Sequence, residues 1–296
     1  MTFAASAVRV LLLGCLMLGG CAHYTVDQRA VLKPTPEPAD APPVVARLAA
    51  LGVSGETRSI TTDDGVKLHA VWIQRDPSWP TVIYFGGNMT IASNNAVYLV
   101  RQFGELPFNL LAVDHRGSGF SEGEPTIDRI LQDSVVAYDY ARHTLGIAPE
   151  QIVLHGFSMG SFMAGYASQH RPIAGLVLEG SATTTEEWVK SSVPWYFKPF
   201  VRIDVAQDMR GRGNRQVVET QTAPLLLMVG TADRQTPAVL TKRLAEAARS
   251  NGHKVEVLIV KNAAHGDVLN DAEGQRTYAD WLKSLTSTQA AALPTS

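Results

Sequence analysis

Strands alternate with helices along this chain from residue 80 onward, and this alternation restricts the possible folds more than any other feature. Short apolar runs typical of buried strands occupy residues 81–85, 109–113, 151–154, 174–178, 224–229 and 255–260. Helical spacing of apolar residues lies between them, most clearly over 126–144. Because the runs are apolar throughout, we expect both faces of the sheet to be covered. The pattern predicts an α/β fold with a mostly parallel, doubly wound sheet of about eight strands.

One folded domain is expected over residues 51–290. It includes two earlier strands, at residues 57–61 and 67–74, on either side of a turn. Apolar residues make up 45% of the chain and charged residues 18%, as in globular proteins. The net charge of −2 gives no field that would attract nucleic acid, so no nucleic-acid partner is expected. The sequence also contains no P-loop, dinucleotide-binding glycine pattern or metal-ligand spacing, so we expect neither a cofactor nor a metal.

Residues 1–20 have the composition of a bacterial export signal. A single charge at Arg9 precedes the apolar run 10–18, which is shorter than the ~20 residues that span a bilayer. The end of this segment, Leu18-Gly19-Gly20-Cys21, resembles a lipobox. That resemblance implies cleavage before Cys21, lipidation of Cys21 and a membrane partner through the lipid anchor. It implies an exported protein, with Ala22 favouring the outer membrane, on its periplasmic or surface face, in a Gram-negative cell. A plain secretory signal is the alternative.

Residues 21–50 are rich in proline, which favours extended chain. We expect either a tether that holds the domain away from a membrane or a segment that crosses the surface of the domain. The prolines concerned are Pro34, Pro36, Pro38, Pro42 and Pro43.

The pattern Gly-x-Ser-x-Gly occurs twice, around Ser121 and around Ser158. A nucleophilic serine of this pattern sits in a tight turn between a strand and a helix. The predicted strand 151–154 and a predicted helix at 159–168 flank Ser158 in this way. Ser121 has no such neighbours, because Pro125 follows where a helix should already run. The context predicts Ser158 as the nucleophile and Ser121 as a loop residue.

Backbone amides on either side of Ser158 are candidates for an oxyanion hole. The first N–H groups of a helix are unpaired, so the N–H of Met159 can stabilise developing negative charge. A second donor is expected in the loop Gly86-Gly87-Asn88-Met89, which follows the strand at residues 81–85. We assign it to the N–H of Gly87. An ordinary turn at the end of a strand is the alternative.

Serine needs a base to take its proton, and only one of the eight histidines lies where that base should be. His265 follows the last predicted strand at its carboxyl end. Hydrolases with this serine turn order their triad as Ser, then Asp or Glu, then His. Asp233 leaves the preceding strand and is the expected acid, with Asp267 as its rival. The predicted catalytic residues are therefore Ser158, Asp233 and His265.

Several segments resemble the α/β-hydrolase superfamily between about residues 56 and 287. Residues 114–121 resemble its D-x-R-G-x-G-x-S turn, in which Arg116 is expected to anchor neighbouring loops. Residues 264–267 resemble its histidine loop, with Ala264 in place of glycine. Residues 86–88 resemble the H-G-N oxyanion loop of depalmitoylases and related esterases, with Gly86 in place of histidine. The resemblance implies a capless esterase or thioesterase.

The connection between Leu178 and Pro224 is about 45 residues long, which leaves room for a minimal cap only. Its aromatic segment, residues 188–200, either forms an acyl-chain groove or a membrane-facing patch, or packs a helix over the sheet. An open site suits a small ester or a bulky acylated substrate.

Three functions remain open from the sequence. The first is hydrolysis of a carboxylic ester or thioester through an acyl-enzyme. The second is peptide cleavage of the serine aminopeptidase type, against which the short connection argues. The third is a catalytically inactive lipoprotein that serves as a binding module.

Overall fold

The computed structural model describes residues 22–194, 196 and 199–292. The predicted signal at residues 1–20 and the predicted lipidation site Cys21 lie outside the described residues.

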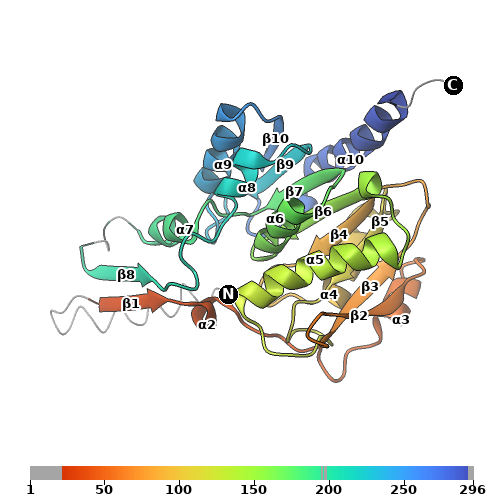
Figure 1. Ribbon diagram of the computed structural model, residues 1–296, viewed down its shortest axis with the longest axis horizontal. Coiled ribbons are helices and arrows are strands. Elements are labelled where there is room, and N and C mark those ends of the chain that lie inside the picture. The colour runs from red at the N-terminus through yellow and green to blue at the C-terminus, as the bar shows by residue number, and fades with distance from the viewer. Residues whose placement is uncertain (1–21, 195, 197–198, 293–296) are drawn as a thin grey trace.

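A central sheet of eight strands organises the protein, in the order β10-β9-β7-β6-β4-β5-β3-β2 (Figure 1). Its strands pair in parallel except at one edge, where β3 runs antiparallel to both β2 and β5. This confirms the mostly parallel α/β sheet expected from the apolar runs. The strands are β2 (Glu56–Thr61), β3 (Lys67–Ile73), β4 (Thr81–Phe85), β5 (Asn109–Val113), β6 (Ile152–Phe157), β7 (Gly175–Glu179), β9 (Leu225–Gly230) and β10 (Val255–Val260).

Helices cover both faces of the sheet, and the two cores they form are separated by the alternation of side chains along each strand. In β4, Ile83 and Phe85 belong to one core, whereas Val82 and Tyr84 belong to the other. The first core is completed by α5 (Ile127–His143), α6 (Gly160–His170), α8 (Arg215–Thr220) and α9 (Ala238–Ser250). The second is completed by α3 (Val44–Ala49), α4 (Ala92–Phe103), the short η2 (Val268–Asn270) and α10 (Ala272–Ala292). A further short helix, η1 (Pro149–Gln151), leads into β6.

Residues 22–50 cross the surface of the domain, which is the alternative to the tether. They form β1 (Ala22–Val26), α2 (Gln28–Val31) and α3, with extended chain between the two helices. Leu32 and Leu48 are buried, one in each core. Proline does extend the chain here, but the apolar side chains on either side of the proline cluster hold it against the domain.

The connection between β7 and β9 is short and contains α7 (Thr185–Ser192), β8 (Val201–Val205) and α8. β8 pairs in parallel with β1 to form a separate two-stranded sheet. In Figure 1 this pair lies beside α7, away from the central sheet. We call β1, β8 and α7 together the arm.

Candidate active site

Ser158 lies in a strained turn at the carboxyl end of β6. Its φ is +53°, and it is one of three non-glycine residues with positive φ in the described part of the chain. Such a conformation costs about 1–3 kcal/mol and persists only where the surroundings enforce it. Here the N–H of Ser158 donates to the carbonyl of Glu179 on β7, at 2.8 Å. The strain and its support are the geometry expected of a nucleophile between a strand and a helix.

The glycines around this turn are required by close backbone contacts. A Cβ at Gly156 would lie 2.3 Å from the carbonyl oxygen of Gly160. A Cβ at Gly160 would lie 2.0 Å from the carbonyl oxygen of Phe85, at the end of β4. The Gly-x-Ser-x-Gly pattern therefore lets β6, α6 and β4 approach each other closely behind Ser158.

Asp233 and His265 form a hydrogen-bonded pair. Nδ1 of His265 lies 2.7 Å from Oδ2 of Asp233, and both side chains are largely buried. The hydroxyl of Thr236 donates to the same Oδ2, and the N–H groups of Gln235 and Thr236 donate to Oδ1, each at 2.8 Å. Burial by itself raises the pKa of Asp233, but the hydrogen bonds and the charge of His265 outweigh it and hold that pKa below its usual value.

This pairing sets which nitrogen of His265 can act as a base. An ionised carboxylate only accepts hydrogen bonds, so Nδ1 carries the proton and Nε2 is left to accept one. The rival acid, Asp267, instead accepts a hydrogen bond from Asn270 at 2.7 Å. Of the two carboxylates, Asp233 is the one that is hydrogen-bonded to His265.

The histidine loop packs against the residue that precedes Ser158. The rings of His265 and Phe157 lie 4.8 Å apart, centre to centre. A Cβ at Gly266 would lie 2.9 Å from the tip of the Phe157 ring. A Cβ at Gly180, just after β7, would lie 3.1 Å from Cε1 of His265. The structure therefore brings the Asp233–His265 pair to the same end of the sheet as Ser158.

Gly87 lies directly beside Ser158, since a Cβ on this glycine would be 3.3 Å from Cβ of Ser158. The carbonyl of the preceding Gly86 accepts a hydrogen bond from Nε2 of His115, at 2.7 Å. In a trans peptide the N–H points opposite to the C=O, so this bond fixes the direction of the Gly87 N–H. The Gly87 carbonyl is held in turn by the hydroxyl of Thr90, at 2.9 Å.

His115 is a supporting residue that the sequence reasoning missed. It precedes Ser158 in the chain, so the triad order excluded it as a base without suggesting another role. Its ring is buried, and burial lowers its pKa against the opposing effect of the bond to Gly86. The contact requires a proton on Nε2, and the lowered pKa favours the neutral imidazole that carries it. Its position just after β5, near the oxyanion loop, was the one available signal.

The N-terminal segment also holds the predicted oxyanion loop, residues 86–89. We call residues 31–37 the strap. The side chain of Asn88 donates to the carbonyl of Val31 at 2.5 Å and accepts from the N–H of Lys33 at 3.0 Å. Met89, the next residue in the loop, has a φ of +64°. Asn88 therefore clamps the strained loop to a segment more than fifty residues earlier in the chain.

The second Gly-x-Ser-x-Gly match has a structural role. The hydroxyl of Ser121 accepts from the N–H of His69 at 2.8 Å and donates to the carbonyl of Asp114. Nearby, Arg116 is buried and pairs with Asp133 at 2.7 Å and Asp64 at 2.9 Å. These contacts fit the expected anchoring of loops by Arg116.

The aromatic segment contributes one contact to the acid loop. Nε1 of Trp188, on α7, donates to the carbonyl of Gln235 at 2.8 Å, two residues after Asp233. Tyr196 and Phe200 are exposed. The segment is therefore divided between helix packing and an exposed surface.

Comparisons with known proteins identify the family. The model of the prolyl oligopeptidase family matches residues 105–289, more than half of the chain. The human protein ABHD12B is 27% identical over 71% of this chain and 62% of its own length. YfhR of Salmonella typhi is 29% identical over 68% of this chain and 72% of its own. The lysophosphatidylserine lipase ABHD12 of Danio rerio is 26% identical, over 64% and 54%. The chain thus spans less than two thirds of the two ABHD relatives.

Solved structures agree on the fold. The esterase Pf2001 of Pyrococcus furiosus superimposes with a TM-score of 0.64 at 21% identity, over 85% of this chain and 99% of that one. The acylaminoacyl peptidase of Pyrococcus horikoshii gives 0.59 at 17% identity, over 78% and 41%. With the family match and the sheet order, these likenesses lead to one conclusion: the chain belongs to the prolyl oligopeptidase family and has the α/β-hydrolase fold.

Proposed function

We propose that this protein hydrolyses carboxylic esters or thioesters, with Ser158 as nucleophile, His265 as base and Asp233 as the acid that orients His265. The observation that carries the proposal is that the strained turn at Ser158 lies at the same end of the sheet as the Asp233–His265 pair. In that pair, Nδ1 of His265 lies 2.7 Å from Oδ2 of Asp233.

Each group has a defined part in the reaction. The Ser158 oxygen attacks the acyl carbon while Nε2 of His265 takes the hydroxyl proton. The N–H groups of Gly87 and Met159 stabilise the oxyanion that forms. His265 then gives its proton to the leaving alkoxide or thiolate, and an acyl-enzyme remains. Water, deprotonated by His265, attacks the acyl carbon of this ester. His265 then returns the proton to the Ser158 oxygen as the bond to the acyl carbon breaks, which releases the acid and regenerates Ser158 and neutral His265.

Labelling with a fluorophosphonate probe tests the proposal. We expect the chain from Ala22 onward to be labelled, and labelling to be lost in Ser158→Ala but kept in Ser121→Ala. Ser121 is the matched control because it shares the local sequence pattern. If the folded wild type is not labelled, the protein has no activated serine, and the inactive binding module becomes the favoured function.

Peptide hydrolysis is the second candidate, and the match to the prolyl oligopeptidase family favours it. An aminopeptidase needs acidic side chains that are available to bind the substrate's amino group. Glu187 is already paired with Arg243 at 3.1 Å, and Glu186 accepts from the N–H of Gly211 at 2.9 Å. Turnover of aminoacyl amides faster than of acyl esters by the same protein would reverse our preference.

We also propose that the protein is exported and anchored to a bacterial membrane through lipid on Cys21. The support is the lipobox-like sequence at residues 18–21. No helix in the described residues is long and apolar enough to cross a bilayer. Metabolic labelling with an alkynyl fatty acid should mark the wild type and not Cys21→Ala. Label that persists in the variant would contradict lipidation at this residue.

A further inference from the structure

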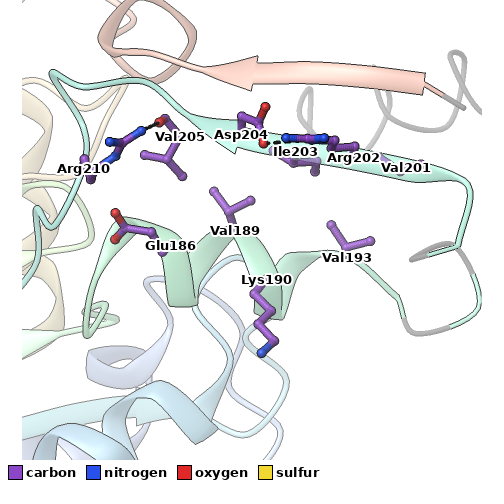
Figure 2. Close-up of a pocket in the computed structure, with 10 residues that line it drawn as sticks. All are labelled: Glu186, Val189, Lys190, Val193, Val201, Arg202, Ile203, Asp204, Val205 and Arg210. Atoms are coloured by element: carbon purple, nitrogen blue, oxygen red, sulfur yellow. Dashed lines mark hydrogen bonds and ion pairs between the residues drawn. The ribbon is translucent and has the colours of Figure 1, made fainter.

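A groove lined by aliphatic and charged side chains, of about 600 Å³, lies between α7 and β8, within the size range of ligand pockets. In Figure 2, Val189 on α7 and Val193 directly after α7 point toward β8, Val205 points from β8 toward α7, and Lys190 points away from the groove. The aliphatic side chains that line it are Val189, Val193, Val201, Ile203 and Val205.

Among the described residues, the apolar side of β8 is only partly covered, with Val205 packed against the first core. Val201, Ile203 and Val205 are only partly buried, and β8 has β1 as its one partner in the small sheet. A sheet of two strands is marginally stable in water unless its apolar face packs on something. Protein interiors are normally filled to crystal-like density, so an open row of aliphatic side chains favours an apolar occupant.

The surroundings of the groove indicate which apolar occupant fits. Phe200, directly before β8, is 60% exposed, and Tyr24, on β1, is 48% exposed. Aromatic side chains in such positions are typical of the boundary between water and lipid. The charged residues of the lining are of both signs: Glu186, Lys190, Arg202, Asp204 and Arg210. Arg202 pairs with Asp204 at 3.3 Å and Arg210 donates to the carbonyl of Val205, so lipid phosphates would have to compete for these guanidinium groups.

The chain enters the fold at this place. Ala22, the first residue of β1, pairs with Val201, the residue after Phe200. The apolar run 10–18 and Cys21 immediately precede it in the sequence. The groove therefore lies where a chain anchored through Cys21 would meet a membrane. A lipid of that membrane is then the nearest apolar molecule.

We propose that the groove between α7 and β8 binds one hydrocarbon chain of a bilayer phospholipid, with Phe200 and Tyr24 at the lipid surface. This docks the arm on the membrane. The inference does not depend on the proposed hydrolysis, because no step involves Ser158, but the choice of a membrane lipid as occupant rests on the proposed anchor at Cys21.

The test uses the chain from Ala22 onward, which keeps the whole of both cores and removes the lipid anchor. Ser158→Ala is included so that no lipid is hydrolysed. Binding of a fluorescent fatty acid, and its displacement by unlabelled fatty acids of increasing length, is followed by fluorescence. Flotation with vesicles of phosphatidylethanolamine and phosphatidylglycerol tests the bilayer as the source.

Two changes at one position disable the groove in different ways. Val193→Asp places a charge in it, and Val193→Trp fills it with an apolar ring. Val45→Asp is the matched control, because Val45 is a 44% exposed valine on α3 that does not line the groove.

We expect saturable binding that tightens up to about fourfold for each added methylene until the groove is full. Both Val193 variants should weaken this binding at least tenfold and lower vesicle flotation, whereas Val45→Asp should match the parent. Three results would each overturn the proposal: unchanged binding in both Val193 variants, fatty-acid binding without flotation, or a dimer that both Val193 variants dissociate. The last would make the groove a contact between copies.

Discussion

Removal of the Asn88 side chain should slow catalysis without unfolding the protein. Asn88→Ala deletes both hydrogen bonds that join the oxyanion loop to the strap, at 2.5 Å to Val31 and 3.0 Å to Lys33. Each is worth about 0.5–1.5 kcal/mol, so the loop loses about 1–3 kcal/mol of restraint. Met89, the residue after Asn88, has a left-handed backbone conformation. We expect this strained backbone to relax when the restraint is lost.

That energy sets the expected loss of activity. A restraint of about 1–3 kcal/mol corresponds to a change of about 5- to 150-fold in the population of the ordered loop. Loss of a single oxyanion donor costs about 10²–10³ in kcat, which is the upper limit for this variant. We therefore expect kcat to fall about 10- to 100-fold on a p-nitrophenyl acyl ester, with a much smaller change in KM, because the donor acts mainly in the transition state.

Asn94→Ala is the control. Asn94 also binds the N-terminal segment, because its side-chain oxygen accepts from Nη2 of Arg47 at 2.7 Å, and this hydrogen bond does not involve residues 86–89. Its kcat should stay within about twofold of the wild type, a change worth less than about 0.5 kcal/mol. If Asn88→Ala keeps its wild-type kcat while circular dichroism shows a folded protein, the strap does not position the loop.

Three further predictions concern other supports of the site. His115→Gln keeps a donor near Gly86 and should retain most activity, whereas His115→Ala should lose kcat. Because burial lowers the His115 pKa, the wild type should lose stability as pH falls below about 6.5, and urea unfolding should show a smaller loss in His115→Gln. Gly160→Ala should lower the thermal stability of the protein far more than Gly52→Ala. A Cβ at Gly52 would have open space around it, so only the positive φ of Gly52 opposes that substitution. Equal losses of stability in the two variants would contradict the close packing behind Ser158. The wild type should lose stability as pH falls from about 3.9 through the lowered pKa of Asp233, and this loss should be smaller in Asp233→Asn. The kcat of Asp233→Asn near neutral pH should also fall steeply.

The central sheet could be predicted because its evidence is local. Each strand of its parallel part is a short apolar run between turn residues. β4, β5 and β10 have the expected bounds, and the bounds of the other three strands differ by one to three residues, as with 151–154 against Ile152–Phe157. The placement of Asp233 and His265 followed from the same source. Both leave the carboxyl ends of strands that pair side by side, and parallel strands bring those ends together.

The arm and the strap could not be predicted, because their evidence is long-range. β1 and β8 are separated by most of the chain, and although each alternates apolar and polar residues, a run of five residues does not show which distant segment a strand will pair with. The proline cluster correctly predicted extended chain, but it did not predict which part of the domain that chain would contact. Only Leu32, Val44 and Leu48 hinted at attachment, and single apolar residues in a polar segment have too little periodicity to show a packed face.

The strap also changes how the N-terminus relates to catalysis. If Cys21 carries the anchor, only about ten residues separate the membrane from Val31 and Lys33, which hold Asn88. A domain cut at residue 51 would keep Ser158, Asp233 and His265 but would lose these two contacts and the buried Leu32. We therefore expect such a fragment to show the kcat loss of Asn88→Ala together with lower thermal stability. Equal kcat for the fragment and the chain from Ala22 would show that the oxyanion loop is ordered without the strap.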